Sequence, residues 1–438
     1  MKLKTNDEGL KRVIGIWGLG ATVVNFSIGA GIYALPAIIG IHLGPAGIIG
    51  YLLCALMFVA IVLCYVEIGS KFKTSGGSYA YVERAFGPFA GFVINWLFFF
   101  GWGVLSDAAI VNLVADSLSV IFPAFSEFWF RAFFFAVVLG AITILNVVSA
   151  KGGLNFVKFI TLIKLLPLLA IIIGGFSKIH PENLQIKQFP SIHSFGETAL
   201  ILFFAFAGFE TALNVGGEIK NPKRTIPRGV LLGGIIVLLI YLLIQSVMQG
   251  VLGDQVVDFK NSALAEVAKR SMGPIGATIV VFAAVVSGIG AVGGDIFASS
   301  RLLFAGATDG LFPKFLGKIH TKYATPYWSV IVYSLMIFIF SIAGGFKQLA
   351  VLASGTLLII YLAVILAMIK IRREPDIESE NTFKIPGGLI VPSMAIVAIL
   401  WVLSNLTSQE SVSITIFLAV ICLVYWAQKF LIKKPSST

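Results

Sequence analysis

Twelve apolar stretches, each long enough to cross a bilayer, constrain the fold of this chain more than any other feature. A helix needs about 20 apolar residues to span roughly 30 Å of hydrocarbon. Only 12% of the 438 residues are charged, about half of the roughly 25% usual in soluble domains. The predicted spans are 13–40, 44–69, 89–121, 131–149, 154–176, 195–217, 229–252, 275–304, 327–344, 347–370, 387–405 and 411–432. We therefore predict an all-α integral membrane protein with twelve transmembrane helices in a single domain over residues 1–438.

The first and sixth spans each carry glycine near the middle. Residues 25–36 read NFSIGAGIYALP, and residues 203–211 read FFAFAGFET. A helix that unwinds inside hydrocarbon leaves amide and carbonyl groups unpaired, which is tolerated only where those groups line a polar cavity. Two such breaks are typical of a solute site near the midplane of a transporter. The competing interpretation is that the glycines only allow close helix packing.

The basic residues predict the orientation of the spans. Most of the 32 lysines and arginines fall in the loops on the same side as the amino terminus. By the positive-inside rule, both termini are cytoplasmic. Basic loops of this kind determine topology and meet lipid headgroups, so the net charge of +11 does not require a nucleic-acid partner.

Four motifs, in this order along the chain, resemble the amino acid–polyamine–organocation (APC) superfamily of transporters. They are GAGIY at 29–33, FAGFE at 206–210, EIKNPKRTIPR at 218–228 and SRLLFAGATDGLFP at 300–313. The resemblance implies a LeuT-like fold with two inverted repeats of five helices, in which helices 1 and 6 are broken. The repeats would cover 13–176 and 195–370, and 387–432 would form two peripheral helices.

The breaks suit an amino acid zwitterion. Free amides at the start of the half-helix after Gly29, at the positive end of the helix dipole, suit a carboxylate, and carbonyls at a helix end suit an ammonium. The resemblance implies amide contacts from Ala30 and Gly31. It also implies carbonyl contacts from Ser27, Phe204 and Ala207.

Three aromatic residues are candidates for the substrate pocket or its gate. Phe206 lies inside the second break, where the resemblance implies an aromatic that closes over the substrate. Phe204 and Trp102 are further candidates, although most of the 37 phenylalanines are expected to face lipid or the core. We expect Phe206 to matter more than Trp102.

Lys164 is the deepest predicted cation. It lies twelve residues past Gly152, roughly 18 Å along a helix, and charged groups at such depth are usually functional. The resemblance implies that its ammonium occupies the place of a sodium ion in sodium-coupled relatives and bridges the first, fifth and eighth spans. Exchange of a proton during transport and a fixed structural cation are both open interpretations.

Three acidic residues also lie deep within predicted spans. Glu210 belongs to the second motif and is a candidate proton sensor or a tie between the two half-helices. Asp107 and Asp295 are candidates to pair with Lys164 or to accept a cationic substrate. The sequence spacing does not choose between these roles.

These observations predict a secondary transporter of amino acids in the cell membrane that works by alternating access. It would be proton-coupled or an exchanger, and independent of sodium; a cationic amino-acid or polyamine antiporter is the alternative. The chain has no Walker motif, no catalytic constellation and no cluster of metal ligands, so we expect no ATP hydrolysis, enzyme activity, cofactor or metal. Polar residues gather at one depth instead of forming the continuous pore of a channel. The sequence does not predict the oligomeric state.

Overall fold

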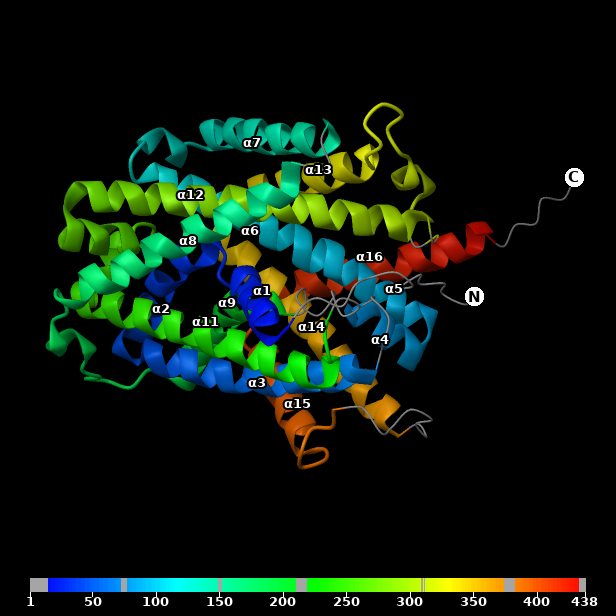
Figure 1. Ribbon diagram of the computed structural model, residues 1–438, viewed down its shortest axis with the longest axis horizontal. Coiled ribbons are helices and arrows are strands. Elements are labelled where there is room, and N and C mark those ends of the chain that lie inside the picture. Colours follow the sequence, from blue (N-terminus) through cyan, green and yellow to red (C-terminus); the bar gives the residue numbers. More distant parts are fainter. Residues whose placement is uncertain are drawn as a thin grey trace, which may run out of the picture.

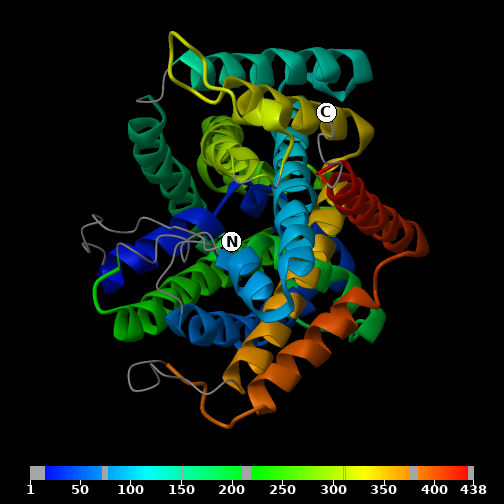
Figure 2. The same ribbon diagram turned by 90° about the vertical axis from the view of Figure 1, so that its right-hand side faces the viewer.

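The described part of the chain is a bundle of helices with no β-strand among its residues (Figure 1). The computed structural model describes residues 15–71, 77–148, 152–209, 219–308, 310, 312–373 and 383–432. Two views at right angles place α7 beside α13 along one side of the bundle and α15 on the opposite side (Figure 2). The all-helical prediction is confirmed for these residues.

Most elements of the first half lie within the first five predicted spans, whereas the helix at 77–86 and the turn at 123–126 lie between spans. The elements of this half are α1 (Ile16–Ser27), η1 (Ala30–Tyr33), α2 (Leu35–Leu43), η2 (Gly44–Ala46), α3 (Gly47–Lys71), α4 (Gly77–Phe86), α5 (Pro88–Trp96), η3 (Leu97–Val104), α6 (Leu105–Ser119), η4 (Pro123–Ser126), α7 (Phe128–Val148) and α8 (Gly152–Phe176). Most of the η elements are 3-10 turns, but η3 is a stretch of π-helix between α5 and α6. The third predicted span is therefore helical throughout but changes its winding in the middle.

The remaining elements run through the second half. They are η5 (Pro181–Leu184), α9 (Ile192–Phe206), α11 (Pro222–Leu252), η7 (Gly253–Phe259), α12 (Ala263–Thr308), η8 (Lys314–Gly317), α13 (Tyr327–Ala343), α14 (Phe346–Arg372), α15 (Ile390–Leu403) and α16 (Ser408–Ile432). Gly344 and Gly345 separate α13 from α14. Helix α12 bends at Gly273, where φ is +76°.

The first glycine break is present. Helix α1 ends at Ser27, Ile28 leaves the helical region, and a 3-10 turn over Ala30–Tyr33 precedes α2. The short turn and the extended Gly29 leave part of the backbone here outside α-helical hydrogen bonding. The break therefore supplies the polar backbone groups that the sequence predicts.

The second break begins directly after α9. Ala207 is extended, and Gly208 has φ +110°. A β-carbon on Gly208 would lie 2.9 Å from the carbonyl carbon of Phe26, so a side chain there would collide with the last turn of α1. The two breaks thus touch each other, although residues 210–218 lie outside the described residues.

The surface of the bundle is apolar along several helices. Seven helices among the described residues are long and apolar enough to cross a membrane, and five shorter apolar helices accompany them. In the most apolar window of α16 only 11% of residues are buried, and in that of α7 only 22%. Trp129 is 81% exposed and Leu423 69% exposed. Such wide apolar surfaces require a nonpolar surrounding.

Candidate functional site

Lys164 places its ammonium against the first break. The Nζ atom donates to the Asn25 carbonyl at 2.5 Å, and the Tyr33 hydroxyl donates to the Lys164 carbonyl at 3.1 Å. The side chain is only 6% exposed. Helix α8 is therefore joined to the chain on both sides of the break, before it at Asn25 and after it at Tyr33. These contacts link the first and fifth predicted spans.

Tyr241 of α11 joins the ends of both broken helices. Its hydroxyl lies 2.9 Å from the Ser27 carbonyl oxygen and 2.8 Å from the Ala205 carbonyl oxygen. The ring is buried, so these carbonyls have a partner where water is excluded. The sequence reasoning missed this residue. A single tyrosine within an otherwise aliphatic stretch of span 7 is the signal that would have found it.

Phe204 covers the first break. Its ring lies 3.4 Å from the position that a β-carbon on Gly31 would take. The ring also contacts Trp102, with centroids 5.7 Å apart, and Phe346, with centroids 5.9 Å apart. An aromatic layer beside Gly31 is thus formed by Phe204 of α9, Trp102 of the π-helical stretch and Phe346 of α14.

Phe206 points elsewhere. Its ring packs against Phe58, Tyr241 and Tyr51, with centroids 5.5, 5.5 and 6.4 Å apart. These partners belong to α3 and α11, on a different side of α9 from Trp102 and Phe346. Of the two phenylalanines, Phe204 is the one that the geometry brings to Gly31.

The remaining backbone candidates lie close to the same point. Ala30 is fully buried, Ser27 is 8% exposed and Ala207 is 4% exposed. A β-carbon on Gly288 of α12 would lie 3.5 Å from the Ala30 β-carbon, so η1 packs directly on α12. Glu210, the predicted proton sensor, lies outside the described residues.

Asp107 and Asp295 come together at a second polar site. The Tyr333 hydroxyl of α13 lies 2.9 Å from Asp295 Oδ2 and 3.4 Å from Asp107 Oδ2. Ser299 donates to Asp295 Oδ1 at 3.3 Å. Asp107 is 2% exposed. The site therefore joins α6, α12 and α13 through two carboxyl groups and one phenol.

This carboxyl pair is separate from Lys164 and from the break. Within the described ranges, neither aspartate forms an ion pair with Lys164. Asp295 follows Gly288, which packs beside Ala30, by seven residues, or roughly 10 Å along α12. The described residues also hold no group of three potential metal ligands. The chemistry that this arrangement offers is hydrogen bonding and proton transfer.

Comparison with known proteins shows which family this chain matches. The model of the amino acid permease family matches residues 14–434. The branched-chain amino acid permease BcaP of Bacillus subtilis is 25% identical, with 96% of this chain and 94% of the relative covered. The serine/threonine exchanger SteT of the same bacterium is 26% identical over 98% of this chain and 99% of the relative. The human cystine/glutamate transporter is 27% identical over 88% of this chain and 78% of the relative.

Proposed function

Because this chain belongs to the amino acid permease family, we propose that it carries amino acids across the membrane by alternating access, as a secondary transporter that does not need sodium. It is a multi-pass membrane protein and not an enzyme. The observation that carries the proposal is the contact between the two helix breaks, where Gly208 meets Phe26 and Lys164 holds the Asn25 carbonyl. Backbone polar groups gathered in mid-bundle are the usual means of holding a small zwitterion in a membrane.

The proposed architecture has twelve spans in two inverted repeats, over 13–176 and 195–370, with 387–432 at the periphery. The seven long apolar helices and the five shorter ones support this number of spans. The breaks support the repeat, since they interrupt the first and sixth spans. We place both termini in the cytoplasm and the protein in the cell membrane, on the distribution of lysine and arginine.

The substrate carboxylate is assigned to the amides of Ala30 and Gly31, and the ammonium to the carbonyls of Ser27, Phe204 and Ala207. The burial of Ser27, Ala30 and Ala207 supports this assignment, because water does not compete there for the backbone groups. Tyr241, which the sequence did not predict at this site, also contacts one of these carbonyls. Its hydroxyl lies at the Ser27 carbonyl, so it shares that acceptor with the bound ammonium.

Phe204, backed by Trp102 and Phe346, is the proposed gate over the substrate. Its ring contacts the β-carbon position of Gly31, whereas Phe206 packs against α3 and α11. Phe206 then acts through the Tyr241 ring, as a packing partner of the helix end. This assignment exchanges the roles that the sequence pattern favours for the two phenylalanines.

Lys164 is the proposed replacement for a sodium ion. Its ammonium meets a backbone carbonyl at the break, the kind of ligand that a sodium ion takes. A sodium ion at the same place would be repelled strongly by the ammonium in a medium of low dielectric constant. Sodium-independent transport follows from this assignment.

The carboxyl pair and Lys164 are the proposed sites of proton coupling. Two carboxylates that share one hydroxyl donor repel each other, and such a pair holds a proton between them. Glu210 remains a proposed proton site on the motif alone. Exchange of one amino acid for another, without net proton movement, is the alternative mode. Asp107 contacts Tyr333, which also contacts Asp295, so we rank neutral amino acids ahead of cationic amino acids and polyamines.

Uptake into proteoliposomes tests this function. The purified protein is supplied with a panel of labelled neutral and cationic amino acids and polyamines, with and without an inward proton gradient. We expect uptake of neutral amino acids that a proton gradient or internal amino acid accelerates. Replacement of sodium by potassium or choline at constant pH should change nothing. A strict sodium requirement contradicts the role given to Lys164, and uptake equal to that of empty liposomes for the whole panel contradicts the function.

A further inference from the structure

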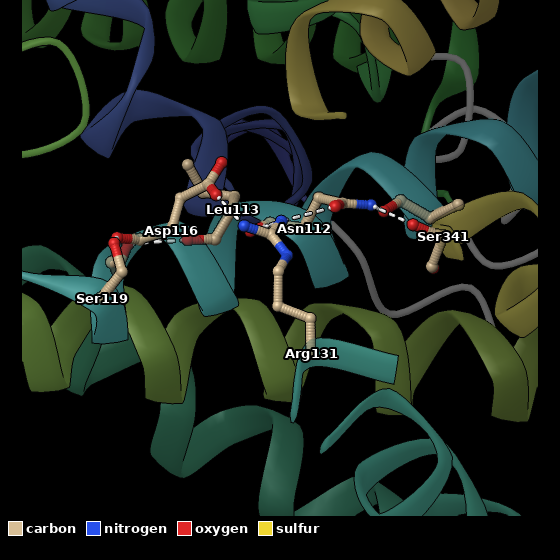
Figure 3. Close-up of polar contacts among 8 residues, drawn as sticks. Asn112, Leu113, Asp116, Ser119, Arg131 and Ser341 are labelled. Carbon is tan, nitrogen blue, oxygen red and sulfur yellow. Dashed lines mark hydrogen bonds and ion pairs between the residues drawn. The ribbon is translucent and has the colours of Figure 1, made fainter. Parts of the chain in front are cut away.

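A cavity of about 320 Å³ lies away from the helix breaks, at the end of the bundle where α13 turns into α14. The end of α6, the beginning of α7 and the turn at Gly344 and Gly345 form its walls. Figure 3 shows Arg131 reaching from α7 to Asp116 and Asn112 of α6. We call this place the α6–α7 cavity.

The walls of the α6–α7 cavity carry one positive and one negative group side by side. Arg131 Nη1 donates to Asp116 Oδ1 at 2.6 Å, and Nη2 donates to Asn112 Oδ1 at 2.6 Å. The Asn112 amide in turn donates to the Ser341 carbonyl at 2.9 Å. The two charged side chains are 20% and 22% exposed, so both remain open to the cavity.

Both groups have bonding capacity left over. A guanidinium has five N–H donors and a carboxylate about four acceptor sites. The contacts within this cluster use a few of these. A ligand that carries an anion and a primary ammonium can therefore add bonds to Arg131 and Asp116 without separating them.

The side of the cavity formed by α7 faces apolar surroundings. Phe128, Trp129 and Phe133 at the start of α7 are 54%, 81% and 68% exposed. Exposed aromatic rings at a helix end are typical of the boundary between lipid headgroups and hydrocarbon. Further along the helix, Val137 and Ile144 are 52% and 63% exposed, which continues an apolar surface suited to acyl chains.

We propose that the α6–α7 cavity binds the headgroup of a zwitterionic phospholipid with a primary ammonium, of the phosphatidylethanolamine type. Its phosphate is bound by Arg131 and its ammonium by Asp116, while its acyl chains lie along α7. A trimethylated choline headgroup lacks N–H donors for Asp116, and a glycerol headgroup lacks the cation. A free amino acid has no acyl chains to cover the apolar surface of α7.

The proposed lipid site has a route to the transport machinery. Gly344 and Gly345 line the cavity, and the next residue, Phe346, contacts Phe204 over the first break. A bound headgroup braces this turn and, through it, the start of α14. The lipid site stands without the transport proposal, since its test measures binding and not uptake.

Thermal unfolding in detergent with added lipids of matched acyl chains is the test. We expect phosphatidylethanolamine to raise the melting temperature of the parent by about 3 °C or more above the effect of phosphatidylcholine or phosphatidylglycerol. Arg131→Gln and Asp116→Asn should lose this difference. Ala132→Leu should lose it as well, because Ala132 lines the cavity and the larger side chain fills it without altering the ion pair.

Matched controls separate the site from general effects on stability. Arg270→Gln breaks a comparable pair with Glu266, 3.0 Å long, on α12, and should keep the full response to phosphatidylethanolamine. Equal shifts with all three lipids, or a preference for phosphatidylglycerol, would overturn the proposal. So would a full response in Ala132→Leu, or an equal shift with free phosphoethanolamine at the same concentration.

Discussion

The two aspartates of α6 stand in opposite surroundings although they share one helix. Asp107 is 2% exposed and faces a second carboxyl group through Tyr333. Asp116, roughly 13 Å further along the helix, is 22% exposed and pairs with Arg131 at 2.6 Å. Asp116 thus has a countercharge beside it, whereas two carboxyl groups that share a hydrogen-bond partner can share a proton. We therefore expect the pH dependence of transport to come from Asp107 in the middle of the bundle, and expect Asp116 to contribute to stability and lipid binding.

The largest expected effect is that of bulk at Gly31. In Gly31→Val the new side chain begins 3.3 Å from Leu35 and 3.4 Å from Phe204, and it occupies the space assigned to the substrate carboxylate. We expect substrate binding to the purified protein to fall below detection. Gly140→Val is the control, because no atom lies within 4 Å of a β-carbon on Gly140 of α7. Unchanged substrate affinity in a monodisperse Gly31→Val protein would show that the substrate does not bind at this break.

Loss of the Lys164 ammonium is expected to abolish uphill uptake. Lys164→Gln removes the charge from the Asn25 carbonyl, so a pH gradient can no longer drive transport, while exchange of internal for external amino acid persists. Uptake against a gradient and counterflow exchange, measured on the same proteoliposomes, separate these activities. Lys178→Gln, in an exposed loop, serves as the control.

A structural role for Lys164 gives a different result. If the ammonium only holds α8 to α1, the Lys164→Gln protein should melt at a much lower temperature and keep the pH profile of the parent. Normal melting together with an unchanged pH profile would leave Lys164 with neither role.

Replacing either Asp107 or Asp116 by asparagine tests the comparison between these two residues of α6 directly. Asp107→Asn removes one of the two carboxyl groups that share a proton, so the uptake rate should lose most of its dependence on pH. Asp116→Asn should leave the pH profile alone and lower the free energy of unfolding by about 1 kcal/mol, as the loss of a partly exposed ion pair does. The pH profile of uptake and the midpoint of unfolding are the two measurements. Identical pH profiles in both variants would show that the middle of the bundle holds no proton site at Asp107.

The smallest expected effect concerns the hydroxyl of Tyr241. Tyr241→Phe keeps the ring but removes the donor to the Ser27 and Ala205 carbonyls. One net hydrogen bond is worth about 1 kcal/mol, or roughly a fivefold loss of substrate affinity. Tyr425→Phe, whose ring packs against Phe89 and Phe92, should retain the affinity of the parent. A loss as large as that of Gly31→Val would mean that Tyr241 orders the break itself.

The sequence predicts the helices and both breaks because these depend on short-range chemistry. Apolar length sets the spans, and glycine at 208 allows a backbone conformation that other residues rarely adopt. The structure bears this out at Gly208, where φ is +110°.

The partners across the bundle are not predictable from the sequence, because they depend on how far each helix is rotated. Phe204 and Phe206 are two residues apart and equally apolar, yet only Phe204 faces Gly31. The sequence likewise shows that Asp107 and Asp295 are deep, but not that Tyr333 joins them. Tyr241 was missed because a tyrosine within a span resembles a packing residue until its hydroxyl partners are known.

The π-helical stretch η3 fixes the rotation of everything that follows it on α6. A π-helix places more residues in each turn than an α-helix, and each residue turns an α-helix by about 100°. If the same residues 97–104 wound as an ordinary α-helix instead, they would turn further and swing the rest of α6 by roughly that angle. Asp107 would leave Tyr333, Asn112 would leave Ser341 and Asp116 would leave Arg131. The winding of this stretch, with none of these side chains altered, thus separates the helix that makes these contacts from one that makes none of them.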